Sequence, residues 1–197
     1  MTLRRRLFPI FVLLAFGALP SFATLIFADG TTYYEFGFGT APVATYGCDN
    51  SLGNPFNDCS LTTDPVANQT NDSPWTFTGP ASLFVTDIGD VGDAFQIFDF
   101  GVSKGTTSST PNTGLDPCPG LDVGCAVANA AYSKGTFLFG AGAHSLTINL
   151  TQNASGTTFG QSVFRLDPAV PEPATFGLIG AGLVGIALVT RRKRSRL

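Results

Sequence analysis

Apolar and polar residues alternate along the middle of this chain, and this period of two is what most restricts its fold. The alternation recurs in four stretches, which contain Trp75, Leu83, Phe137 and Leu146. Successive side chains of a β-strand point to opposite faces of the sheet, so the pattern predicts strands that bury one face. Further strands are expected at 25–28, 32–37, 94–100 and 161–166.

Short turn sequences separate the expected strands. They are Asp-Gly at 29–30, Thr-Gly-Pro at 78–80, Gly-Ala-Gly at 140–142 and Ala-Ser-Gly at 154–156. Such sequences are typical of places where a strand ends. The best helix candidate, 123–133, is short and contains glycine. Many short strands without a convincing amphipathic helix predict an all-β fold, an antiparallel β-sandwich or jelly roll.

The first 23 residues have the three parts of an export signal. Arg4 to Arg6 form a basic start, residues 7–19 an apolar run, and Ser-Phe-Ala at 21–23 a small-residue cleavage site. We expect a signal helix that is removed by cleavage after Ala23. The alternative is an uncleaved N-terminal anchor, against which the short apolar run argues.

The other end of the chain predicts a short transmembrane helix. Residues 174–190 carry no charge, and Arg191, Arg192, Lys193 and Arg194 follow at once. A helix of that length reaches about 25 Å, slightly less than the roughly 30 Å of a bilayer core. The basic cluster is expected to stay in the cytoplasm, which places the preceding domain outside.

An extended tripeptide comes just before this apolar segment. Pro171 and Pro173 flank Glu172, and two prolines hold a chain out of the helical conformation. The order of Val-Pro-Glu-Pro, a Gly-rich apolar segment and a terminal arginine cluster resembles the PEP-CTERM sorting signal. That tail is also labelled "ice-binding protein C-terminal", a label that describes the tail and is no evidence of ice binding.

The resemblance covers the last part of the chain, residues 169–197, with its motif at 171–173, its helix at 174–190 and its basic tail at 191–197. It implies export across the inner membrane of a Gram-negative bacterium, an inner-membrane intermediate, and processing near Pro171, Glu172 and Pro173 by an exosortase-type enzyme. Bacteria with this system typically make extracellular polysaccharide and biofilm matrix.

The expected secreted body, residues 24–168, is acidic. Between residues 24 and 170 three Lys or Arg stand against thirteen Asp or Glu, because eight of the eleven basic residues lie in the two ends. Such a body repels polyanions, so we expect no nucleic-acid partner. The 44% of hydrophobic residues excludes a disordered tail protein.

Four cysteines fit an oxidising compartment. Cys48, Cys59, Cys118 and Cys125 allow three pairings. We favour Cys48–Cys59 and Cys118–Cys125, because each pair brackets a stretch rich in Gly, Pro, Asn or Asp. Zinc is the alternative, but the chain has no Cys-x-x-Cys and a single histidine, His144.

One acidic loop carries a calcium hypothesis. Asp87, Asp90 and Asp93 are spaced three residues apart with glycines between them, in a loop between two expected strands. Calcium prefers carboxylate and carbonyl oxygens from such loops. The alternative is a solvated connection, and apart from this calcium we expect no cofactor.

Recognisable catalytic motifs are absent, so we expect no enzyme. There is no HExxH, GxSxG or P-loop, and the remaining acids lie mostly in turn sequences. We expect a cell-surface or extracellular-matrix protein whose body contacts polysaccharide or matrix proteins. The alternatives are an extracellular glycan-active enzyme that uses the same tail, and a permanently membrane-tethered surface protein.

Overall fold

The computed structural model describes residues 24–48, 59 and 67–169. The expected export signal, Pro171, Glu172, Pro173, the apolar segment and the basic tail lie outside these residues. Among the residues described, no helix is long and apolar enough to span a membrane.

The described body is a mostly antiparallel β structure with one short helix, so the all-β prediction is confirmed. Its elements are β1 (Thr24–Leu25), β2 (Tyr33–Phe38), β3 (Val43–Ala44), β4 (Tyr46–Gly47), β5 (Ala67–Gln69), β6 (Trp75–Asp87), β7 (Ala94–Asp99), β8 (Val102–Thr106), α1 (Val123–Ala128), β9 (Lys134–Gln152) and β10 (Gly160–Pro168). Hydrogen bonds join the main strands in the order β4-β2-β10-β6-β9-β7-β8.

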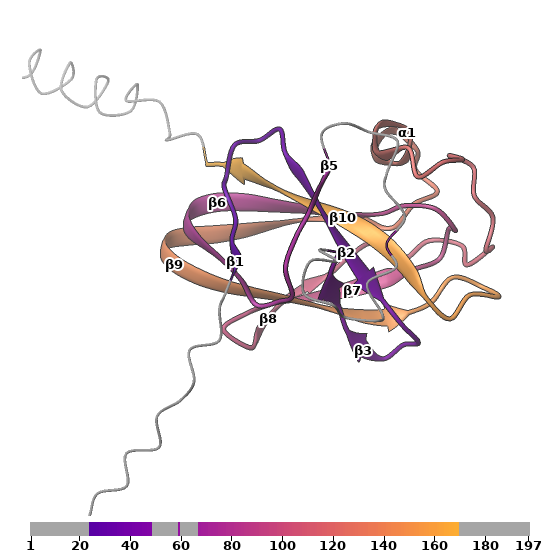
Figure 1. Ribbon diagram of the computed structural model, residues 1–197, viewed down its shortest axis with the longest axis horizontal. Coiled ribbons are helices and arrows are strands. Elements are labelled where there is room, and N and C mark those ends of the chain that lie inside the picture. The colour runs from indigo at the N-terminus through magenta and orange to yellow at the C-terminus, as the bar shows by residue number, and fades with distance from the viewer. Residues whose placement is uncertain (1–23, 49–58, 60–66, 170–197) are drawn as a thin grey trace, which may run out of the picture.

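Two long paired strands fold this sheet into two layers. β6 and β9 pair along most of their length, and both turn back at the left of Figure 1. Beyond the bend, β10 pairs with β6 from Ala81 onward, whereas β7 pairs with β9 from Leu146 onward. One layer therefore holds β2, β10 and the second half of β6, and the other holds the first half of β6, β7 and β8.

The sequence-based turns at 78–80 and 140–142 are wrong as strand ends. They are bends inside β6 and β9, and the ladder continues through them with Gly79 opposite Gly142 and a register shift before Ala81. A side chain on Gly79 would collide with the carbonyl of Gly140, so the two chains approach this closely only with glycine there.

Helix α1 is shorter than the expected 123–133. Asp122 caps its start by accepting a 2.8 Å hydrogen bond from the Cys125 amide. The chain becomes extended at Asn129, and Lys134 Nζ donates to the carbonyls of Ala126, Val127 and Asn129. A partly exposed lysine side chain thus completes the end of a helix that is too short to satisfy its own carbonyls.

The main core lies between the two layers and is built from aromatic rings. Phe36 packs against Phe95 at 5.3 Å and against Trp75 at 6.2 Å between ring centroids. The residues that alternate inward on β6 and β9 are buried here, as the period of two predicted. A second buried cluster, with Val123 and Tyr132, fills the space between α1 and the outer face of one layer.

Candidate functional site

An open groove lies between edge strands of the two layers. β1 is hydrogen-bonded to the start of β6, and β5 to β2, both in parallel pairings. Between β1 and β5 the surface is hollowed by about 370 Å³. Its lining residues are Leu25, Ile26, Phe27, Tyr34, Asn68, Gln69, Thr70 and Asn71.

Strand geometry decides which side chains the groove exposes. The Ile26 amide donates a 2.8 Å hydrogen bond to the Thr76 carbonyl, and the Ile26 side chain is buried in the core. Leu25 and Phe27, its neighbours on either side, are exposed. This alternation presents two apolar side chains to solvent beside each other.

Buried and partly buried hydrogen bonds hold the other wall of the groove. The Tyr34 hydroxyl accepts a 3.3 Å hydrogen bond from the Phe27 amide, while the Tyr34 ring stacks on Phe164. The Asn71 carbonyl accepts a 2.8 Å hydrogen bond from the Trp75 indole, and the Thr70 hydroxyl donates to the Glu35 carbonyl. The backbone beneath the groove is therefore fixed by the core.

The groove offers amide groups and no ionised group. Asn68, Gln69 and Asn71 are exposed, and within the described ranges their side-chain amides bind no other residue. None of the lining residues is an Asp, Glu, Lys, Arg or His. An exposed phenyl ring beside free amide donors and acceptors suits an uncharged ligand with a hydroxyl-rich edge and an apolar face.

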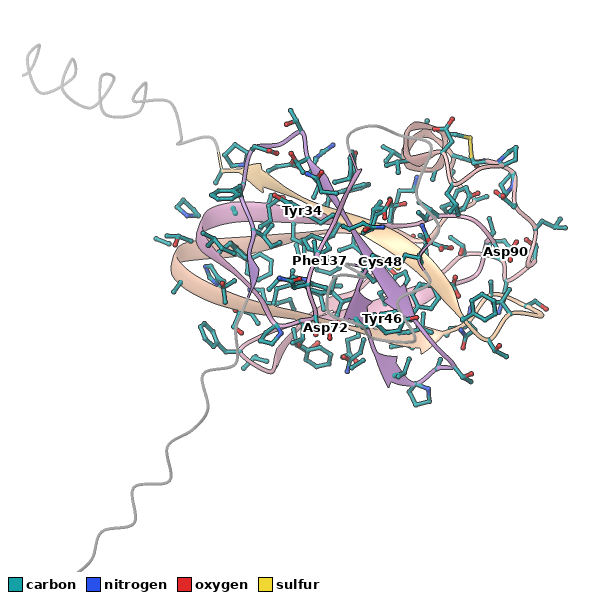
Figure 2. All side chains as sticks on the ribbon, viewed as in Figure 1. Tyr34, Tyr46, Cys48, Asp72, Asp90 and Phe137 are labelled. Atoms are coloured by element: carbon teal, nitrogen blue, oxygen red, sulfur yellow. A yellow bond between two sulfur atoms is a disulfide. The ribbon has the colours of Figure 1, made fainter. Side chains whose placement is uncertain are left out.

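The three predicted calcium residues lie at the opposite end of the sandwich from the bends. Asp87 and Asp93 are buried, and Asp90 is partly exposed near the right of Figure 2. Asp93 Oδ1 accepts a 2.6 Å hydrogen bond from the Ala154 amide, and Asp87 Oδ2 accepts a longer one from Gly92. Across the described part of the chain, no group of three or more acidic, His or Cys side chains is arranged to hold a metal ion.

Burial raises the pKa of two of these carboxyl groups, Asp87 and Asp93. Loss of hydration raises the pKa of Asp93 to about 7, and the charge of Asp90 adds to this effect. Loss of hydration and the charge of Asp93 raise the pKa of Asp87 well above its usual range. The loop in which the sequence pattern predicts calcium therefore contains two buried acids, and the negative charge of one makes ionisation of the other less favourable.

The single histidine is occupied by structural hydrogen bonds. His144 Nε2 lies 3.0 Å from the Gly140 carbonyl, and its ring stacks on Phe77 at 5.0 Å between centroids. Its Nδ1 faces Asp99. Both ring nitrogens therefore have a partner within the sandwich.

Both expected disulfides are present in the structure. Cys48 joins Cys59 and Cys118 joins Cys125, with Cα atoms 5.5 and 5.7 Å apart. The second bridge spans α1 and its preceding loop, where Cys118 belongs to the second buried cluster. It thus ties α1 to the preceding loop on the outer face of the sheet.

The sequence does not predict this groove, because residues 25–27 and 68–71 line it together and no local pattern connects these two segments. The predicted sorting residues Pro171, Glu172, Pro173, Arg191, Arg192, Lys193 and Arg194 lie outside the described residues.

A family model described as the PEP-CTERM protein-sorting motif matches residues 169–193. This range contains Pro171, Glu172 and Pro173 and ends at Lys193, one residue before Arg194. No curated protein and no solved structure matches the chain significantly.

Proposed function

Because this chain carries a PEP-CTERM protein-sorting motif, we propose that it is a non-enzymatic surface or matrix protein of a Gram-negative bacterium. The motif implies that the protein is exported, sorted to the cell surface and processed by an exosortase-type enzyme. Its β-sandwich binds extracellular polysaccharide in the groove between β1 and β5. The apolar segment at 174–190 holds the chain in the inner membrane until the tail is processed.

The chemistry of the groove supports the polysaccharide part of this proposal. Pyranose rings have apolar faces that stack on exposed aromatic side chains, and hydroxyl edges that bond to amides. Phe27 supplies the ring, and Asn68, Gln69 and Asn71 supply the amides. A groove without ionised side chains favours a neutral polysaccharide. The acidic body repels polyanions and attracts polycations without specificity.

A glycan-active enzyme is the alternative that uses the same delivery. Glycoside hydrolysis needs two carboxyl groups about 5–9.5 Å apart on either side of a bound sugar. The groove is lined by no carboxylate, and the acidic pair Asp87 and Asp93 is buried away from solvent. These observations favour binding over hydrolysis.

Binding to neutral polysaccharides tests the groove. The processed protein, collected from the cell surface, is expected to bind at least one neutral polysaccharide, with little dependence on salt because no ion pair is formed. Phe27→Ala should weaken binding roughly tenfold, the equivalent of one lost aromatic stacking contact. Phe159→Ala removes another exposed phenyl ring outside the groove and should leave binding unchanged. Equal effects of the two variants would refute the groove as the site.

The intact mass of the protein from cells and medium tests the sorting. Loss of residues 1–23 and of the basic tail is expected. A mature form that keeps residues 191–197 would instead support the permanent tether.

A further inference from the structure

One end of the sandwich lies directly beside the start of the sorting tail. β10 ends at Pro168, which pairs with Ala81 next to the bend of β6. The Ala169 amide then donates a 3.3 Å hydrogen bond to the Pro80 carbonyl. We call this the tail-side end and define it by the two bends, 79–80 and 140–142, and by Pro168. Figure 1 shows the bends of β6 and β9 at the same end as the last residue of β10.

The connection from this end to the predicted membrane segment is very short. Only five residue steps separate Ala169 from Ala174, where the uncharged run begins. A fully extended chain covers at most about 18 Å in five steps, and the headgroup layer alone occupies about 5–7 Å of that distance. A chain tethered by its tail must therefore hold its tail-side end close to the lipid surface.

The tail-side end has no charge in its bends and carries exposed apolar side chains. Residues 78–81 and 139–143 contain no Asp, Glu, Lys or Arg. Leu138, on β9 just before the bend, is 75% exposed. The turn between β7 and β8 reaches the same end, because the Phe100 amide donates to the Ser145 carbonyl close to the bend of β9. There Phe100 is 66% and Val102 68% exposed.

Acidic side chains lie at both ends of the sandwich. Asp87, Asp90 and Asp93 lie at the opposite end, where Figure 2 labels Asp90. Near the tail-side end Asp167 pairs with Arg165 and Asp99 contacts His144. Asp29 is exposed there, since its neighbour Gly30 lies beside Pro168.

Phe100 has a positive φ, which is an unfavourable backbone conformation for a bulky residue. Phe100 and Gly101 form the two-residue turn between the paired residues Asp99 and Val102, with φ values of 46° and 77°. Turns of this kind favour Asn-Gly, and a bulky side chain at positive φ is strained. Because the Phe100 ring is 66% exposed, packing within the described body offsets little of this strain.

We propose that the tail-side end, with Phe100, Val102 and Leu138, lies against the outer surface of the lipid bilayer while the tail anchors the chain. This inference rests on the membrane intermediate of the proposed function. It adds a fixed orientation of the body relative to the lipid surface.

Tryptophan quenching in vesicles tests this orientation. The full-length chain is incorporated into vesicles of phosphatidylglycerol and phosphatidylcholine. The phosphatidylcholine carries a nitroxide on its headgroup. The chain has one tryptophan, Trp75, which is fully buried, so the parent provides the background. Phe100→Trp places a reporter at the tail-side end. Phe159→Trp is the matched control, an equally exposed phenylalanine next to Gly160 at the other end of β10.

We expect quenching of Phe100→Trp to be roughly threefold stronger than that of Phe159→Trp, because the quencher is confined to the headgroup layer. Leu138→Trp, which leaves the strained turn intact, should behave like Phe100→Trp. Equal, weak quenching at both ends in chains that float with the vesicles would overturn the orientation alone.

Two further outcomes also contradict the proposal. Chains that do not float with vesicles overturn the membrane tether of the proposed function, and the orientation with it. Fluorescence changes that need no nitroxide and grow with protein density identify a second copy of the chain as the partner of this surface, and overturn the lipid contact.

Discussion

His144 and Asp99 join the bend of β9 to the end of β7 through a 2.9 Å contact between His144 Nδ1 and Asp99 Oδ2. Asp99 Oδ1 also accepts a 3.2 Å hydrogen bond from the Ser145 amide. The opposite ring nitrogen of His144 faces the Gly140 carbonyl, so a protonated ring can donate to both neighbours. One mostly buried carboxylate thus ties the bend to the turn that carries Phe100.

Asp99→Ala should therefore destabilise the body. It leaves the His144 ring and the Ser145 amide without their acceptor, which costs about 1–3 kcal/mol in the free energy of unfolding. Denaturant titration measures the change. Gln96→Ala removes an exposed hydrogen bond to Ser103 on the same hairpin and should cost less than about 0.5 kcal/mol. Similar losses in both variants would show that Asp99 has no special role.

The buried pair Asp87 and Asp93 predicts a body that is more stable in mild acid than in mild base. The pKa of Asp93 is about 7 in the folded chain, and its usual value is 3.8. The folded state therefore binds more protons than the unfolded state between these values, so stability falls as the pH rises through that window. We expect a loss on the order of 2–4 kcal/mol between about pH 4 and pH 8.

Asp93→Asn separates this effect from general charge repulsion. The amide oxygen can still accept from the Ala154 amide, but the side chain no longer ionises. The variant should match the parent near pH 5 and exceed its melting temperature near pH 8. A parent protein with the same melting temperature at both pH values contradicts this assignment.

Calcium binding by Asp87, Asp90 and Asp93 stays a prediction. If these carboxylates bind calcium, the melting temperature in calcium should exceed that in EDTA. The difference should be larger near pH 8 than near pH 5, because protons compete with the metal for the same oxygens. Superimposable melting curves near pH 8 would remove the calcium hypothesis.

Phe100→Asn should stabilise the body, although it removes a large apolar side chain. Asn tolerates positive φ, so the variant relieves strain of about 1 kcal/mol in the turn and raises the melting temperature. Gly101→Ala is the control: its added Cβ meets no atom within 4 Å, yet φ is 77°, so it should lower the melting temperature. A less stable Phe100→Asn variant would mean that the phenyl ring supports the fold.

The local patterns predicted the strands better than their ends. Alternation placed Phe137 and Leu146 inward, because the period of two is a property of each strand by itself. The glycines at 79 and 142 predict strand ends because they belong to short turn-type sequences, which are also a local feature. Only the pairing of β6 with β9 shows that the two glycines lie opposite each other and let a continuous ladder bend.

The acidic loop shows the same division. Spacing and glycines predicted that Asp87, Asp90 and Asp93 would come close, but spacing carries no information about burial. Val91 and Ile88 pack into the second cluster beneath α1, and this packing removes Asp87 from water. Burial then changes which charge the loop can hold.

Local sequence patterns were enough to identify the sorting tail, which implies export, and to predict the all-β class, because both depend on motifs or periodicity within one segment. They favoured one of the three possible cysteine pairings, and the structure contains that pairing. The groove between β1 and β5, the bends of the long strands and the position of the tail beside Pro80 were decided by tertiary structure. They arise where segments distant in the chain are brought together by burial of one shared core, and that juxtaposition has no local signature.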